Sequence, residues 1–223
     1  MKKGLTDITI ILYRSFSMQP IRESTIGGVN QFIESQKLAP GEAVLSLCLF
    51  DDQYDRPINA QRIHEVPPLN DTTYVPRGDT CLYGAIGTAV HETGQRLSAQ
   101  PESERPEHVI ILIVTDGEEN SSNLKEWSKQ HTKATIRQAI EQQTSVYKWK
   151  FQYIGANQDA ITNAANIGIQ AKSAVNYTSN NHGTRKLYGD LSSNIVNLRA
   201  CVSSDIDFTA DQLQAQMDAK NEK

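Results

Sequence analysis

Residues 7–18 read DITIILYRSFSM and residues 109–120 read VIILIVTDGEEN; each stretch joins an apolar run of strand length to a turn rich in side-chain oxygens. Uninterrupted apolar runs are typical of parallel strands that helices cover on both faces. In an open α/β sheet the ligand crevice lies outside the carboxyl ends of such strands. We therefore expect Ser15, Ser17 and Asp116 to meet at one edge of a sheet. An all-oxygen site of this kind suits a hard cation such as Mg²⁺.

Strand and helix patterns alternate along the rest of the chain, which favours a doubly wound α/β fold with helices on both faces of the sheet. Further strands are expected over residues 43–50, 147–154 and 174–177. Helices are expected over residues 20–33 and 82–97, and from Ser121 or Ser122 past Ile140. A short helix capped by Asn157 or Asp159 should run through Asn166, and a longer one should span residues 187–202. Thr80 stands where the second helix needs an N-cap. The cluster Asp51, Asp52 and Asp55 is interpreted as a solvated hairpin turn.

The chain is expected to form one domain over residues 1–204, followed by an amphipathic helix and a frayed tail over residues 205–223. Thr209 and Gln212 have capping-box spacing, which predicts a helix from about residue 210 to 218. Leu213 and Met217 should face the domain, and the last four residues should fray.

Composition limits the class of protein. The 223 residues are 38% hydrophobic and 22% charged, which indicates a soluble globular chain, and the net charge of −4 argues against general nucleic-acid binding. No run reaches the roughly 18 apolar residues of a membrane span, and residues 1–6 lead into the first strand without a secretory segment. A cytoplasmic protein is expected. Three cysteines without CxxC spacing predict reduced thiols rather than a disulfide framework or a zinc site.

These motifs together resemble the von Willebrand factor A (VWA) domain family. Its metal-ion-dependent adhesion site (MIDAS) combines a DxSxS turn after the first strand, a threonine at the start of a later helix, and an aspartate in a TDG-like turn. Ser15 and Ser17 match the serines, Thr80 in GDTCLYGAIG matches the threonine, and Asp116 in TDGEEN matches the aspartate. The resemblance covers residues 7–156 and is closest to compact single-domain members from bacteria and their phages. It implies a mostly parallel central sheet with one antiparallel edge strand near residues 56–63.

The chain departs from the family's metal site at three positions. Tyr13 replaces the first aspartate, Phe16 replaces the glycine between the serines, and Gly84 stands where a second acidic residue is expected. Loss of an outer partner of this kind typically weakens metal binding about 10 to 100-fold. The resemblance therefore implies a degenerate site in which Ser15, Ser17, Thr80 and Asp116 hold Mg²⁺ weakly or not at all.

The replacements are aromatic, and two interpretations stay open. In one, Tyr13, Phe16, Tyr74 and Tyr83 form an exposed patch at the rim, of the kind that often carries the energy of a protein interface. In the other, Tyr13 packs inward and fills the volume of the missing metal. Glu118 and its neighbour Glu119 either add negative charge beside the site or serve the first turn of the next helix.

Catalytic patterns are missing from the sequence: there is no GxxxxGK[ST], GxSxG or HExxH, and the five histidines have no ligand spacing. We expect a noncatalytic module that engages a protein partner at the rim through residues of this set: Tyr13, Phe16, Tyr74, Tyr83 and Glu118. An alternative is a small-ligand pocket in the same crevice that senses or sequesters a metabolite or nucleotide. A third possibility is self-association through an edge strand or the C-terminal helix.

Overall fold

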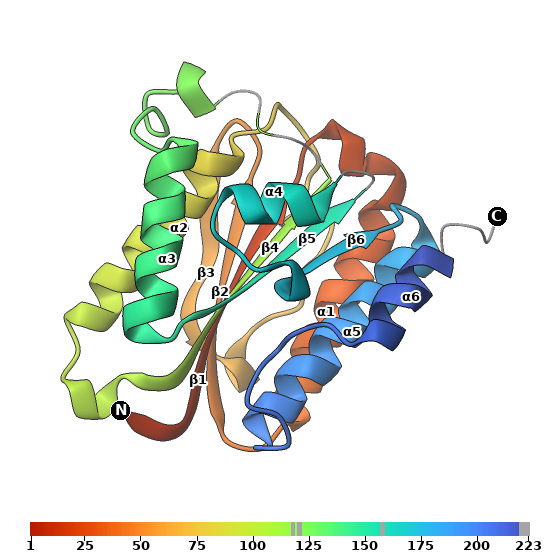
Figure 1. The fold of residues 1–223 in the computed structure, drawn as a ribbon. Coiled ribbons are helices and arrows are strands. Elements are labelled where there is room, and N and C mark those ends of the chain that lie inside the picture. Colours follow the sequence, from red (N-terminus) through yellow and green to blue (C-terminus); the bar gives the residue numbers. More distant parts are fainter. Residues whose placement is uncertain (117–118, 120–121, 157–158, 219–223) are drawn as a thin grey trace.

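A six-stranded sheet lies at the centre of the residues described by the computed structural model, which are 1–116, 119, 122–156 and 159–218 (Figure 1). Its strand order is β3-β2-β1-β4-β5-β6. Every neighbouring pair is parallel except β2 and β3, which are antiparallel. The strands are β1 (Lys2–Tyr13), β2 (Glu42–Phe50), β3 (Tyr54–Arg62), β4 (Pro106–Thr115), β5 (Lys150–Ala156) and β6 (Ala174–Tyr177). The predicted mostly parallel sheet with one antiparallel edge strand is confirmed.

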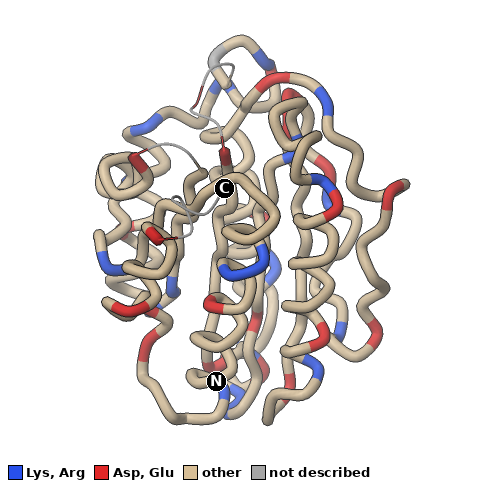
Figure 2. Tube along the Cα trace, turned by 90° about the vertical axis from the view of Figure 1, so that its right-hand side faces the viewer, with Lys and Arg blue, Asp and Glu red and all other residues tan. Residues whose placement is uncertain are grey.

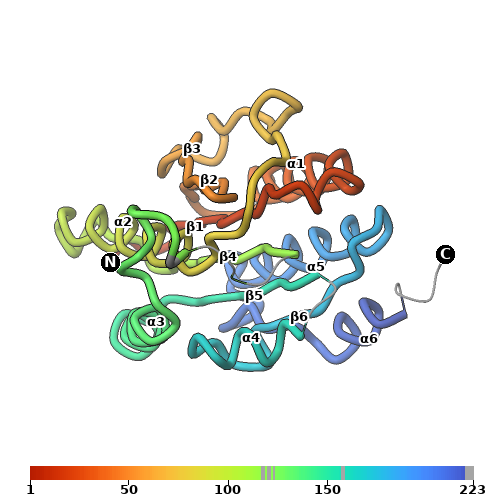
Figure 3. The backbone as a smooth tube through the Cα atoms, turned by 90° about the horizontal axis from the view of Figure 1, so that it is seen from above, coloured from red at the N-terminus to blue at the C-terminus, as the bar shows by residue number. Residues whose placement is uncertain are grey.

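Helices cover both faces of this sheet, as predicted for a doubly wound fold (Figure 3). One face carries α1 (Arg22–Leu38), α5 (Asn181–Arg199) and α6 (Ala210–Asp218). The opposite face carries α2 (Leu82–Ser98), α3 (Lys133–Tyr147) and α4 (Ala160–Asn166). Short 3-10 turns complete the chain: η1 (Phe16–Ile21), η2 (Ile63–Glu65), η3 (Glu102–Glu104), η4 (Ser122–Leu124) and η5 (Ala171–Ser173). No helix of the described residues is long and apolar enough to cross a membrane.

The centre of the sheet sets the position of the candidate site. β1 and β4 are adjacent and in register, with Leu12 opposite Val114. From β1 the chain passes through α1 to β2 on one side, and from β4 it passes through α3 to β5 on the other. The turns after β1 and β4 therefore flank the point where the strand order reverses, which is where open α/β sheets bind ligands.

Two predicted boundaries are wrong. The helix expected after Ser121 or Ser122 begins only at Lys133, where Thr132 caps it by accepting a hydrogen bond from the Thr135 amide. The strand expected over residues 147–154 begins at Lys150, because α3 runs through Tyr147 and Lys148 then takes a left-handed backbone with φ 60° that ends the helix. Aromatic and polar residues alternate over this boundary, so the sequence pattern does not mark it.

The C-terminal helix forms where it was predicted. The Gln212 side chain accepts from the Thr209 amide at 2.9 Å, and the Gln212 amide donates to the Thr209 hydroxyl at 3.2 Å. Leu213 packs against the core, but Met217 is exposed and Gln216 is buried instead, so the prediction for Met217 is wrong. The predicted frayed end, residues 219–223, lies outside the described residues. Figure 2 shows basic and acidic residues interspersed along the helices of this side of the molecule.

Candidate functional site

Three of the four predicted metal ligands come together at the rim between β1 and β4. The Ser17 hydroxyl donates to Asp116 Oδ1 at 2.9 Å, and the Ser15 and Ser17 hydroxyl oxygens lie 2.7 Å apart. Ser15 also caps η1 by accepting from the Ser17 amide. Hydroxyls from the first turn and a carboxylate that follows it by 99 positions thus meet as the sequence predicted.

Thr80 is engaged by the residue that replaces the family's first aspartate. The Tyr13 hydroxyl lies 2.5 Å from Thr80 Oγ1, and both residues are buried. The Tyr13 ring packs against Phe50 with ring centroids 5.2 Å apart. Of the two interpretations of Tyr13, the structure shows the inward one, in which the phenol fills the space beside the threonine.

The exposed aromatic patch does not form as predicted. Tyr74 is fully buried and donates its hydroxyl to the Tyr13 carbonyl at 2.7 Å, so neither Tyr13 nor Tyr74 offers a surface contact. A buried carbonyl satisfies the Tyr74 hydroxyl, which allows the ring to stay inside. Phe16 is 70% exposed and Tyr83 is half-buried. Glu118, the remaining predicted contact residue, lies outside the described residues.

The N-terminus of α2 is capped from a distant loop rather than by Thr80. Cys81 occupies the N-cap position without a side-chain hydrogen bond. The Glu119 carboxylate accepts from the Tyr83 amide at 2.7 Å, and the Ser122 hydroxyl accepts from the Gly84 amide at 3.1 Å. The prediction that Thr80 caps this helix is therefore wrong. From the sequence, Glu119 is expected beside the site or in the first turn of the next helix. Its cap of α2 is not readable from the sequence, because it acts across 36 positions of the chain, whereas capping patterns are local.

Gly84 is required by packing. A Cβ atom at this position would lie 2.4 Å from the Ser128 Cβ and 2.8 Å from the Trp127 ring. Any side chain would therefore displace the segment that follows η4. This close approach explains why the acidic residue expected at position 84 is absent.

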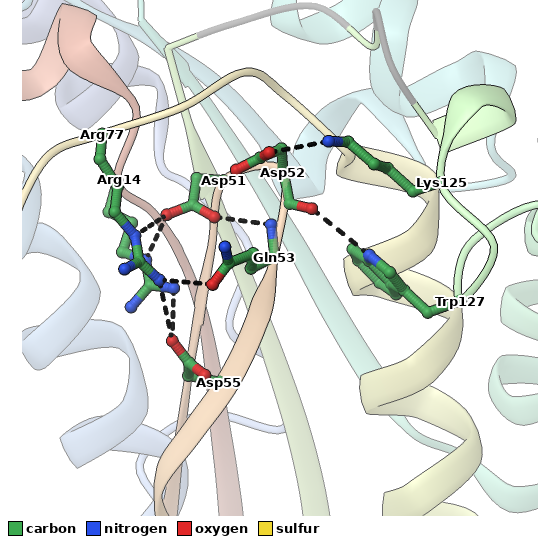
Figure 4. A network of polar contacts seen from close by, with 8 residues as sticks. All are labelled: Arg14, Asp51, Asp52, Gln53, Asp55, Arg77, Lys125 and Trp127. Carbon is green, nitrogen blue, oxygen red and sulfur yellow. Dashed lines mark hydrogen bonds and ion pairs between the residues drawn. The ribbon is translucent and has the colours of Figure 1, made fainter.

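An ionic network fixes the loops that carry the site (Figure 4). Asp51 is fully buried and accepts from Arg14 Nε and Arg77 Nε, each at 2.8 Å. Arg14 also pairs with Asp55 at 2.5 Å. Next to Asp51, Asp52 pairs with Lys125 at 2.8 Å. The predicted hairpin turn is confirmed, because the cluster joins β2 to the antiparallel β3. Its description as solvated is wrong for Asp51, which is buried under two arginines, whereas Asp55 is 52% exposed.

The same network positions the segment that delivers Thr80. The Arg77 amide donates to the Arg14 carbonyl at 2.7 Å, and the Cys81 amide donates to the Asp51 carbonyl at 2.9 Å. Residues on both sides of Thr80 are thus bonded to the ends of β1 and β2. These two backbone hydrogen bonds hold the Thr80 hydroxyl against Tyr13.

Asp116 carries the charge of the site. Burial raises the pKa of Asp116, and the hydrogen bond from Ser17 acts in the opposite direction. No Lys, Arg or His of the described residues forms an ion pair with this carboxylate. The site therefore combines a half-buried carboxylate, two linked hydroxyls and an exposed phenyl ring.

These residues fit a resident divalent cation poorly. Thr80 shares its oxygen with a phenol, and Glu119 is used as a helix cap. No group of three or more His, Cys, Asp or Glu within the described parts of the chain could hold a metal. One carboxylate and two serines leave half of a six-oxygen shell to water.

No family model matches this chain, and no curated protein matches it in sequence. Solved structures match its fold. Proximal thread matrix protein 1 from the mussel byssus, solved with a zinc-occupied MIDAS motif, aligns with a TM-score of 0.55 and 17% identity over 86% of this chain and 46% of its own length. A von Willebrand factor type A protein from Catenulispora acidiphila aligns with a TM-score of 0.54 and 12% identity, over 86% of this chain and 42% of its own.

The manganese-loaded TRAP protein of Plasmodium vivax aligns with a TM-score of 0.54 and 16% identity over 80% of this chain and 70% of its own. This chain spans less than half the length of the mussel protein. These likenesses define the class: the chain has a VWA-like fold, as the sequence resemblance implied. At such identities the likeness concerns the fold alone.

Proposed function

We propose that this chain is a noncatalytic VWA-type binding module that engages a protein partner through the rim at the carboxyl ends of its strands, with a weakened or lost Mg²⁺ site. The observation that carries the proposal is the meeting of Ser15, Ser17 and Asp116 at the switch point of the sheet, beside the exposed Phe16. An exposed aromatic residue next to a fixed polar cluster is typical of an interface centre.

The noncatalytic and cytoplasmic assignments belong to the same proposal. Ser15 and Ser17 bond to each other, Ser17 donates to Asp116, and neither hydroxyl has a hydrogen bond to an imidazole of the described residues. A serine nucleophile needs an adjacent base. Cysteine usage supports a reducing compartment, because no disulfide joins the three cysteines, and Cys48 and Cys81 are buried.

Partner capture from extract of the native host tests the binding role. Phe16→Ala and Asp116→Asn are expected to lose the captured partner, because both residues lie on the rim. The matched control is Val202→Ala, which removes a 75% exposed apolar side chain that follows α5. Equal capture by all four proteins would rule out the rim as the binding surface.

Calorimetric titration with MgCl₂ tests the state of the metal site. Wild type is expected to give little or no heat, because Tyr13 occupies the space beside Thr80. Tyr13→Asp restores the family pattern and should tighten Mg²⁺ binding about 10 to 100-fold. If neither protein releases heat, the Mg²⁺ part of the proposal is discarded and the binding role stands without it.

The alternative of a small-ligand pocket in the crevice stays a prediction. Two cavities of about 240 and 360 Å³ lie elsewhere: one between α3 and η5, the other between α1 and α5. Thermal-shift screening with metabolites and nucleotides separates the alternatives, since a bound ligand raises the melting temperature with the logarithm of its concentration.

A further inference from the structure

The direction of the hydrogen bonds at the rim follows from the chemistry of the three groups. An ionised carboxylate accepts only, so Ser17 uses its single hydroxyl proton on Asp116. The 2.7 Å contact between the two serines must then be a donation from Ser15 to the Ser17 oxygen. The two hydrogen bonds therefore run in series from Ser15 through Ser17 to Asp116. The second carboxylate oxygen of Asp116 can accept a hydrogen bond from a bound partner.

Within the part of the chain that the structure describes, the negative charge of this arrangement has no paired cation. Asp116 receives one hydroxyl hydrogen bond but no ion pair from the described residues. Arg14, which adjoins Ser15, and Arg77, which precedes Thr80, are committed elsewhere, because both pair with Asp51 and Asp55. A half-buried carboxylate gains most from a partner that brings positive charge and hydrogen-bond donors together.

Phe16 supplies a second element of recognition. It lies between the two serines in sequence and is 70% exposed, whereas the glycine of the family pattern would leave bare backbone there. An exposed phenyl ring attracts a cation placed over its face, and guanidinium groups also stack on such rings. The aromatic ring on the turn after β1 and the carboxylate that follows β4, which Ser17 joins by a hydrogen bond, therefore suit a planar cation.

We propose that Asp116, Ser15, Ser17 and Phe16 bind an arginine side chain of the protein partner, whose guanidinium takes the place that a metal ion has in a complete MIDAS. This inference rests on the proposed function and adds the chemistry of the partner to it. It reverses the charge expected from the family resemblance, in which a partner carboxylate completes the coordination of the metal. Here a carboxylate would face Asp116 directly and be repelled.

Arginine is preferred over lysine for a geometric reason. The guanidinium presents several N–H donors in one plane, so it can donate to the open oxygen of Asp116 while stacking on Phe16. An ammonium group is a strongly hydrated point charge without a stacking face. Arginine should therefore bind several-fold more tightly than lysine at this rim.

The test uses capped tripeptides as probes, followed by amide chemical shifts of the full chain in EDTA. Acetyl-Gly-Arg-Gly-amide is expected to shift the Ser17 amide in a saturable manner, the lysine peptide more weakly, and the glutamate peptide not at all. Asp116→Asn keeps an acceptor for Ser17 but removes the charge, so it should weaken arginine binding about tenfold or more. Phe16→Ala should weaken it several-fold. Asp211→Asn, on the exposed start of α6, is the matched control and should bind as wild type does.

Three results overturn the inference. One is the lack of any saturable shift by the arginine peptide in wild type. Another is equal binding by the Asp116→Asn variant, whose folding the same spectra verify. The third is binding of the glutamate peptide only after MgCl₂ is added, which would restore the metal-mediated mode. In each case the partner-capture experiment is independent, so the binding role can stand while the arginine assignment fails.

Discussion

Tyr13 changes the chemistry of the rim while keeping the fold around it. Its ring extends the core of β1, and its hydroxyl reaches Thr80. The backbone carbonyl of the same residue accepts the Tyr74 hydroxyl, so two tyrosines and a threonine form one buried hydrogen-bonded group. The space that a charged aspartate and metal-bound water would share is occupied by a neutral phenol.

Replacement of Tyr13 by Phe should destabilise the protein without changing its shape. The change removes the buried hydrogen bond between Tyr13 and Thr80, which costs about 1–2 kcal/mol of unfolding free energy. Urea denaturation measures the loss. Phe16→Leu, at an exposed position on the adjacent turn, should stay within about 0.5 kcal/mol of wild type. A Tyr13→Phe variant as stable as wild type would show that the short contact contributes nothing.

Asp7 should give the stability a distinctive pH dependence. Burial raises the pKa of this carboxyl, against the opposing effect of Arg96 at 2.8 Å. The folded chain therefore holds this proton more tightly than the unfolded chain, so the contribution of Asp7 to stability falls as pH rises from about 3.8 through the folded pKa. The Asp7→Asn variant has no titrating carboxyl at this position, so it lacks this pH-dependent contribution to stability.

The measurement is the difference in unfolding free energy, variant minus wild type, from urea titrations across that interval. It should increase with pH and then become constant. The variant also loses the ion pair between Asp7 and Arg96, which adds a constant to this difference. Above the folded pKa of Asp7 that constant does not depend on pH. Asp211→Asn, which is exposed, should give a flat difference. A flat difference for Asp7→Asn would contradict the raised pKa.

At the scale of elements, the first turn of α2 depends on hydrogen bonds to the loop after β4. Its first turn donates to Glu119 and Ser122, so the helix that follows Thr80 is capped by residues of the connection after β4. The negative carboxylate also lies at the positive end of the helix dipole. This contact couples the Thr80 segment to the turn that carries Asp116.

Glu119→Ala should destabilise α2 from its N-terminus. Loss of the carboxylate leaves the Tyr83 amide without this acceptor and should cost about 1–2 kcal/mol. Hydrogen exchange should accelerate at Tyr83 more than in the middle of the helix. Glu126→Ala, whose side chain is 89% exposed, is the control and should lie within about 0.5 kcal/mol of wild type. Unchanged exchange at Tyr83 would contradict the capping role.

At the scale of the whole molecule, the network around Asp51 joins segments that are distant in sequence. It connects the end of β1, the β2–β3 turn and the loop before α2 (Figure 4). Arg14 is itself buried, with a side-chain exposure of 6%. Removal of one charge from a buried pair leaves the other uncompensated, which is far more costly than loss of a surface pair.

Asp51→Asn should therefore lower the unfolding free energy by about 3 kcal/mol or more. Asp55→Asn is the matched variant, since Asp55 binds the same arginine but is 52% exposed, and about 1 kcal/mol is expected there. Thermal and urea unfolding both measure the pair. Equal effects of the two changes would show that burial of Asp51 does not control the energy of the network.

Solution mass tests the remaining possibility of self-association. β3 and β6 are the outer strands of the described sheet, and α6 lies beside β6. Light scattering at high protein concentration should give the monomer mass of 24.8 kDa if the rim is the surface that binds a partner. A stable dimer would favour the assembly role expected as an alternative from the sequence.

The sequence by itself determined the layers of this fold and the convergence of the site. The length of an apolar run such as residues 109–114 is enough to identify it as a buried strand. Because ligand sites of open α/β sheets lie at the carboxyl ends of the strands, Ser15, Ser17 and Asp116 are then expected together. The capping box at Thr209 was equally readable because its partners lie three residues apart. These features depend on local patterns or on a general rule of topology.

Only the tertiary structure decided which side chains turn inward. The orientation of Tyr13 depends on Thr80, the burial of Asp51 depends on Arg14 and Arg77, and the start of α2 depends on Glu119. Each of these contacts joins positions far apart in the chain, and a local sequence pattern does not reveal such pairs. The physical reason is that a polar group is buried or exposed according to whether a distant partner satisfies it.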